Sequence, residues 1–252
     1  MLKRLNTAIL PYVLLISLGL CATLLLQQQN LKKINLEQHQ DYEQQKTFIE
    51  ANLNIFKQAP AFGFSNLIAD WVFLRFVQYY GDNEARDEIG NTVIPSFFET
   101  IVQHDPKFIE AHLMLSTATT VYAGQPEKTV KNLEKALTHL SPKIHQNSHF
   151  AWSYKGKDEM LFLNRIDEAK HSYAMAAKWV QKSNINDEAK QEISNRYLGT
   201  VSFLADNPDS TEARIGAWVM LLSNVQDKET RQRIIKEIEE LGANVNITPK
   251  EK

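Results

Sequence analysis

The chain has 252 residues, with 28 Lys and Arg against 30 Asp and Glu, a net charge of −2 and a hydrophobic fraction of 43%. This globular composition, with 9 Gly, 8 Pro and 1 Cys, excludes a wholly disordered chain, a collagen-like chain and a disulfide scaffold. The near-neutral charge gives no reason to expect nucleic acid as a partner, and the length suits one domain of roughly 200 residues with an extension.

An apolar segment, Ala8–Leu26, lies near the N-terminus, in a stretch without charge between Arg4 and Lys32. As a helix rising about 1.5 Å per residue, its 19 residues reach roughly 28 Å, close to the ~30 Å hydrocarbon core of a bilayer. We therefore expect residues 1–30 to form a single-pass membrane anchor.

A cleaved secretory signal is the alternative for this segment, because a signal also begins with basic residues such as Lys3 and Arg4. The apolar region of a signal covers about 7–15 residues and ends in a small-x-small site. Here the apolar run continues through Leu24–Leu26, and Leu20 occupies the −3 position of the candidate site. An uncleaved anchor is favoured, and the basic residues before it favour a cytoplasmic N-terminus.

Residues 31–62 carry one thin apolar stripe, which predicts a stalk helix that docks on the domain near its C-terminal end. A solvated spacer is an equally good interpretation of Lys32–Gln45, and self-association through Leu31–Phe56 is a further, purely structural role. The next helix, Phe64–Tyr80, follows Pro60 and Gly63. Apolar residues surround it on most sides and predict a buried helix: Leu67, Ile68, Trp71, Phe73, Leu74 and Val77.

Helices separated by short turns fill the rest of the chain, and no stretch alternates apolar and polar residues long enough to predict a strand. We expect an all-α protein, with a helical-repeat domain at 63–242 and a flexible tail at 243–252. Asp227 is well placed as an N-cap of the last helix. The helices expected after the first are Pro95–His104, Ile109–Tyr122, Glu127–Leu140, Phe150–Leu163, Asp167–Gln181, Asp187–Leu204, Ser210–Val225 and Glu229–Leu241.

An internal repeat links these helices, because four of them share the i, i+4, i+7 spacing of one helix face. A small residue, a large one and usually another small one recur, and small residues let two helices approach closely. The aligned sets are Ile94/Phe98/Ile101, Thr129/Leu133/Ala136, Ala169/Tyr173/Ala176 and Ala213/Ala217/Met220. In the preceding helices, Leu115-Ser116, Lys155-Gly156 and Leu198-Gly199 hold equivalent places.

This pattern resembles a degenerate tetratricopeptide repeat (TPR), and the best unit is Asn164–Ala176, NRIDEAKHSYAMA. The resemblance covers about Phe64–Val225 and implies an α-solenoid of three to four helix pairs. Its spacings of 35, 40 and 44 residues depart from the regular 34. The chain also looks similar to single-pass TPR-like proteins of cyanobacteria, through Asn66–Asp82, Tyr154–Leu163 and Phe203–Ser210. That resemblance implies a plasma or thylakoid membrane and no particular activity.

Patterns for chemistry are weak throughout the chain. His145 and His149 have the i, i+4 spacing of metal ligands, but they lie in an expected loop without a third ligand nearby. Gly156-Lys157 lacks the remaining residues of a phosphate-binding loop. No GxSxG elbow occurs, and Cys21 lies in the apolar segment. We expect a protein that is not an enzyme and uses no metal or cofactor.

One charged residue, Asp70, lies in the apolar helix five residues before Arg75. A buried carboxylate must be paired or hydrogen-bonded, so a structural pair with Arg75 is the simpler expectation. The alternative is a pocket near Asp70 and Arg75, lined by the neighbouring aromatic residues, in a small-ligand or pigment carrier or an enzyme.

The first helices of a solenoid usually line its binding groove. The TPR-like register places ten residues there: Glu110, Leu113, Thr117, Thr120, Ser153, Lys157, Met160, Arg196, Thr200 and Phe203. Their mixture of hydroxyl, charged and apolar groups suits a peptide or helix of another protein. The favoured hypothesis is a membrane-anchored protein-protein interaction scaffold that assists assembly or maintenance of a photosystem-type membrane complex.

Overall fold

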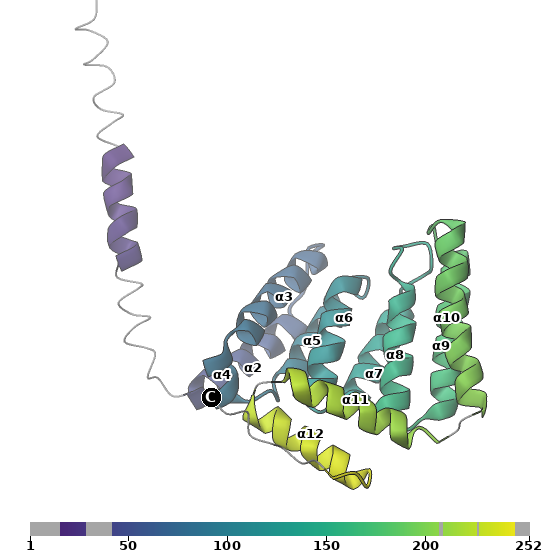
Figure 1. Cartoon of the computed structure of the whole chain (residues 1–252). Coiled ribbons are helices and arrows are strands. Elements are labelled where there is room, and N and C mark those ends of the chain that lie inside the picture. The colour runs from purple at the N-terminus through teal and green to yellow at the C-terminus, as the bar shows by residue number, and fades with distance from the viewer. Residues whose placement is uncertain (1–15, 29–41, 207–208, 226, 245–252) are drawn as a thin grey trace, which may run out of the picture. The chain divides into compact units, whose positions relative to one another are not determined.

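The computed structural model of the chain describes residues 16–28, 42–206, 209–225 and 227–244 (Figure 1). Within these ranges the protein is all-α and contains no strand. The chain divides into two units, residues 1–45 and 46–252, which are described separately.

The first unit contains a helix at residues 16–28, in which the Thr23 hydroxyl donates a hydrogen bond to the Gly19 carbonyl at 2.8 Å. Residues 1–15 and 29–30 of the expected anchor lie outside the described ranges. Among the helices that are described, none combines the length and apolarity that a membrane crossing needs. The anchor therefore remains a prediction from the sequence.

The second unit is built from helices, and those expected after residue 63 have ends within three residues of the expected ones. Their bounds are α2 Tyr42–Gln58 (which starts in the first unit), α3 Ser65–Gly81, α4 Asn83–Ile89, α5 Ile94–His104, α6 Ile109–Thr117, the π-helix η1 Ala118–Tyr122, α7 Pro126–Leu137, α8 His149–Leu161, α9 Ile166–Lys182, α10 Asp187–Asp206, α11 Thr211–Asn224 and α12 Lys228–Glu240. The sequence did not predict α4, which Asp82 caps by accepting a hydrogen bond from the Ala85 N–H at 3.0 Å. Asp227 caps α12 as expected, accepting from the Thr230 N–H at 2.9 Å.

The helices from α3 to α10 pack in layers that follow the chain order (Figure 1). Three of the four aligned sets form the contacts between layers: those of α5 and α7 are fully buried, and in α9 Ala169 and Ala176 are fully buried beside a partly buried Tyr173. At Gly156 of α8, an added Cβ would lie 3.1 Å from Ser172 and Tyr173 of α9. The small residue therefore permits the close approach of these two helices.

Helix α2 is held to α5 by its C-terminal end. Lys57 forms an ion pair with Glu99 at 2.8 Å, and Gln103 donates a hydrogen bond to the Lys57 carbonyl at 2.8 Å. The His104 ring lies 2.7 Å from the Phe56 carbonyl. These contacts fix the point at which the chain enters the layered helices.

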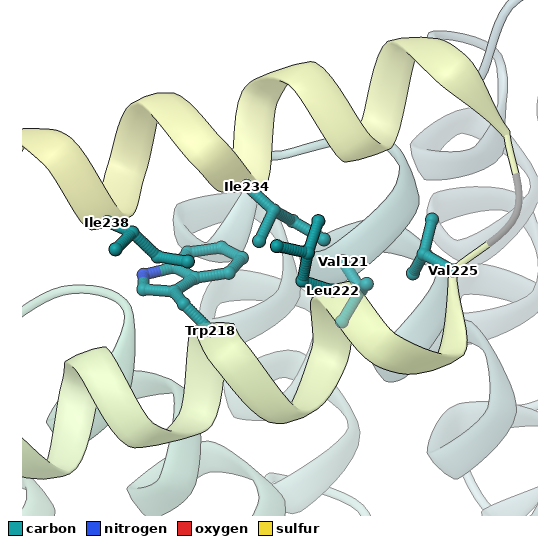
Figure 2. Close-up of a cluster of buried hydrophobic side chains, with 6 residues drawn as sticks. All are labelled: Val121, Trp218, Leu222, Val225, Ile234 and Ile238. Atoms are coloured by element: carbon teal, nitrogen blue, oxygen red, sulfur yellow. The ribbon is translucent and has the colours of Figure 1, made fainter. Parts of the chain in front are cut away.

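The last two helices depart from the expected repeat. Helix α11 packs on α12 and α8 rather than pairing with α10 (Figure 1). In the fourth aligned set Ala213 is therefore exposed and Met220 is 70% exposed, which corrects the expectation of a fourth helix pair with this face in its core. A different face of α11 is buried, in a cluster that reaches back to η1 (Figure 2): Val121, Trp218, Leu222, Val225, Ile234 and Ile238.

Gly124 follows the π-helix, where the chain turns toward α7 with a positive φ of 64°. An added Cβ would lie 2.8 Å from Nε of Arg233, whose guanidinium donates hydrogen bonds to the Val121 and Tyr122 carbonyls. We expect Gly124→Ala to lower the free energy of unfolding by about 1–3 kcal/mol, because the backbone is strained and Arg233 must give up its contacts. Urea unfolding of the full-length protein in mild detergent measures this change.

Gly199→Ala in α10 is the matched control, because nothing lies within 4 Å of its added Cβ. It is expected to stabilise the protein by about 0.5–1 kcal/mol through helix propensity. If both substitutions changed the free energy of unfolding equally, the contacts of Arg233 with the Val121 and Tyr122 carbonyls would not stabilise the turn at Gly124.

Candidate functional site

The expected groove residues come from α6, α8 and α10, which stand in that order in Figure 1, and from η1. Eight of the ten are at least partly accessible: Glu110, Leu113 and Thr117 of α6, Lys157 and Met160 of α8, and Arg196, Thr200 and Phe203 of α10. Within each helix their spacing of three or four residues places them on one face. Each of these three helices thus offers an accessible face of mixed chemical character.

The charged members of this surface have defined neighbours. Glu110 lies 3.5 Å from Nε2 of His145, and Arg196 forms an exposed ion pair with Glu192 at 3.7 Å. The Lys157 ammonium lies 4.4 Å from the centre of the Tyr154 ring. These are surface contacts that a partner can displace at little cost.

Thr120 and Ser153 are buried, which corrects the expectation that they line a groove. The expected register assumed a continuous α-helix from α6, but the π-helix at residues 118–122 rotates the side chains that follow it. Thr120 consequently points into the domain. Ser153 lies against the Tyr197 hydroxyl of α10 and donates a hydrogen bond to the Phe150 carbonyl at 3.1 Å.

A buried polar network lies beneath this surface, centred on the fully buried Asp158 of α8. Asp158 accepts a hydrogen bond from the Thr120 hydroxyl of η1 at 2.7 Å, and the Lys157 ammonium lies 3.6 Å from its other oxygen. The Thr120 hydroxyl oxygen lies 2.9 Å from that of Thr129 in α7. The network joins three helices, η1, α7 and α8.

A second buried pair, Lys155 and Glu159, follows one turn apart on α8. Ser172 of α9 donates a hydrogen bond to Glu159 at 2.6 Å and accepts one from Lys155 at 3.3 Å. Glu134 of α7 lies 3.4 Å from the Lys155 ammonium. The two buried charges, Lys155 and Glu159, therefore compensate each other within the domain, as buried charges require.

Burial shifts the pKa values of Asp158 and of two histidines inside the domain. It raises the pKa of Asp158 to about 6 against the opposing effects of Lys157 and Thr120, and it lowers the pKa values of His112 and His149 to about 4. The Asp158 contribution to stability is fully present below its unfolded pKa of about 3.9 and is lost as pH rises through about 6. The histidine contributions are present above about pH 6.5 and are lost as pH falls through about 4.

We expect Asp158→Asn to steepen the loss of stability on acidification, because the variant keeps the histidine effect and loses the opposing one. Between about pH 7 and 4.5 the additional loss should be about 2 kcal/mol, from a pKa shift of about two units. Urea unfolding across this pH range measures the loss. Asp87→Asn, at an exposed carboxylate of α4, is the control, and an Asp158→Asn profile parallel to wild type would contradict the prediction.

The two histidines with metal-ligand spacing do not converge. Nδ1 of the buried His149 lies 2.9 Å from the Tyr197 hydroxyl, whereas His145 turns toward Glu110. No group of three metal-ligating side chains occurs among the described residues.

Asp70 and Arg75 do not form the buried pair that the sequence suggested, because both are exposed on α3. The Arg75 guanidinium lies 5.7 Å from the Trp71 ring and donates a hydrogen bond to Gln78 at 3.4 Å. The pocket was expected because Asp70 was expected to be buried, and its exposure removes that reason. The expectation of a wholly buried helix is also wrong, since Leu67, Trp71 and Leu74 are each at least half exposed.

A polar pocket of about 340 Å³ lies where α4 and η1 meet the turn between α11 and α12. Arg86 of α4 is held between the rings of Tyr80 and Tyr122, at 5.1 and 5.5 Å from their centres, and donates a hydrogen bond to Asn83. The residues that line the pocket are Asn83, Arg86, Asp87, Tyr122, Asn224 and Asp227.

No known protein family, curated protein or solved structure matches this chain.

Proposed function

We propose that the chain is a membrane-anchored scaffold of TPR-like helix pairs that holds a peptide or helix of another membrane protein. One observation carries the proposal: α6 and α10 each have an accessible face that combines apolar, hydroxyl and charged groups, and α8 between them adds Lys157 and Met160. Such a mixed surface suits a polypeptide, which presents backbone groups and side chains of several kinds. The apolar segment Ala8–Leu26 supplies the anchor.

The interior of the domain supports a binding role. The networks of Asp158 and of Lys155 hold α8 against η1, α7 and α9, so the surface is rigid before a partner arrives. A preorganised surface loses little conformational entropy on binding. Anchoring in the same membrane adds effective concentration for a weakly held partner. Assembly or maintenance of a photosystem-type complex is the role that we propose for such a scaffold.

Site-specific crosslinking in membranes of the source organism tests this function. A photoreactive benzoylphenylalanine replaces Leu113, Met160 or Phe203, one at a time, in the full-length chain. We expect all three positions to crosslink the same polypeptide, and peptide mapping by mass spectrometry to place neighbouring segments of it on successive helices.

The matched controls are Lys131 of α7 and Lys178 of α9, which are exposed on second helices of the pairs. These positions should give no adduct with that polypeptide. Equal adducts from groove and control positions, or none from the groove, would contradict the proposal.

A further inference from the structure

The outer face of α3 follows the heptad of a coiled coil. Exposed residues recur at alternating intervals of three and four, which is the spacing of the a and d positions. Phe64, Trp71 and Gln78 occupy the a positions, and Leu67 and Leu74 occupy the d positions. The opposite face is buried in the domain through Ala69, Val72, Phe76 and Tyr79. Four of the five a and d residues are large and apolar, and such a row on a soluble surface marks an interaction site.

Opposite charges flank this row at the positions that direct helix pairing. Asp70 occupies g and Arg75 occupies e of the next heptad, five residues later, and both are exposed. In a parallel pair of helices, g of one helix faces the following e of the other. Asp70 of each copy then meets Arg75 of the other. In an antiparallel pair g faces g and e faces e, so Asp70 of one copy would not meet Arg75 of the other.

We propose that α3 pairs in parallel and in register with α3 of a second copy of the chain. The five a and d residues of each copy pack together and form the contact between the two helices, which we call the seam. Two symmetric ion pairs between Asp70 of one copy and Arg75 of the other flank the seam. The pairing leaves α6, α8 and α10 free, so it is independent of the proposed scaffold function.

The geometry of the chain suits a parallel pair. A two-fold axis along the paired helices places the N-terminal ends of both α3 helices at the same end of the pair. The seam from Phe64 to Gln78 is only about 21 Å long at 1.5 Å per residue, which is short for an isolated coiled coil. Here α3 is already folded on α5, so pairing does not have to nucleate a helix. Confinement to a membrane adds effective concentration.

A lipid surface fits this face less well. Asp70 and Arg75 border the apolar row, and burying either of them in lipid without a partner costs desolvation energy. The face also lacks the several basic residues that attract anionic headgroups. In the proposed pair each of these charges meets its opposite.

Charge exchange tests the pairing. The molar mass of the full-length chain is measured in mild detergent by light scattering, corrected for bound detergent. We expect wild type to form a dimer of two 28.9 kDa chains. Asp70→Arg and Arg75→Asp should each weaken it at least tenfold, because like charges then face each other. The double variant D70R/R75D should restore the dimer, and an equimolar mixture of the two single variants should form the mixed dimer.

Two further substitutions test whether the dimer depends on the a and d residues of α3 or on exposed leucines in general. Leu74→Glu places a charge in the seam and should give monomers, whereas Leu198→Glu, at a similarly exposed leucine of α10, should leave the dimer intact. Circular dichroism checks that each variant keeps its helices.

Cysteine crosslinking tests the orientation, in a Cys21→Ser background. Leu74→Cys should oxidise to a disulfide-linked dimer, because a d residue meets its own counterpart in a parallel pair, whereas Leu198→Cys should not. Three results would overturn the proposal: a monomeric wild type, single charge variants without effect, or a double variant that fails to recover the dimer. Quenching of Trp71 fluorescence by brominated lipid in vesicles would assign the face to the bilayer and overturn it as well.

Discussion

Lys155→Met is expected to lower the free energy of unfolding by about 3–5 kcal/mol, because it leaves the buried Glu159 carboxylate without its cation. Lys155 and Glu159 are both almost completely buried, so water cannot take the place of the missing partner. The remaining hydrogen bond from Ser172 does not neutralise the charge. Urea unfolding of the full-length protein in mild detergent measures the loss.

Two controls separate this effect from the removal of any lysine. The double variant K155M/E159Q should recover most of the lost stability, because no uncompensated charge remains. Lys190→Met breaks the ion pair with the exposed Asp187 at 3.1 Å and should cost less than about 1 kcal/mol. A similar loss in Lys155→Met and Lys190→Met would mean that the buried pair is solvated.

Trp218→Ala is expected to cost about 3–5 kcal/mol, because it removes the largest side chain of the cluster between α11, α12 and η1 (Figure 2). The indole is almost fully buried and lies edge-on to Phe162, with ring centres 4.8 Å apart. Its removal also leaves Ile234 and Ile238 of α12 facing a cavity. Chemical unfolding gives the loss, and hydrogen exchange should show it first in α12.

Met220→Ala, two residues further along α11, is the matched control. Its side chain is exposed, so the change should stay within about 0.5 kcal/mol. If the two alanine variants were equally stable, α12 would not depend on this cluster.

The sequence predicted helix ends well because turn signals are local. Asp105-Pro106 and Gly124-Gln125-Pro126 mark ends that need no knowledge of distant residues. The aligned sets of α5, α7 and α9 were also predictable, since a small-large-small face permits close packing with a neighbouring helix.

The fourth set shows where such a pattern fails. Ala213, Ala217 and Met220 have the same spacing, but α11 carries a stronger apolar face through Trp218 and Leu222. Burying that face against α12 removes more apolar surface from water than pairing with α10 would. Spacing within one helix does not say which of two faces is buried, or against which neighbour.

The same ambiguity applies to α3. A count of its apolar residues predicted burial on all sides, whereas the heptad spacing and the positions of Asp70 and Arg75 already distinguished an outer face. Asp158 and Glu159 were harder to find, because charged residues are mostly exposed. Their partners Thr120, Thr129 and Ser172 come from other helices, so no local signal marks them.

The packing of α12 against η1 affects the order and the cooperativity of folding. In a helical-repeat protein whose repeats contact only their neighbours, the terminal repeats can unfold separately from the rest. Such a protein can also fold one repeat at a time as it is synthesised. Here Val121 and Ile234 share one cluster although they lie 113 positions apart in the sequence. Such a long-range closure slows folding and makes unfolding a single cooperative event. During synthesis the segment around η1 lacks part of its core until α12 has left the ribosome, so a truncation that removes α12 also exposes Val121 in the middle of the domain.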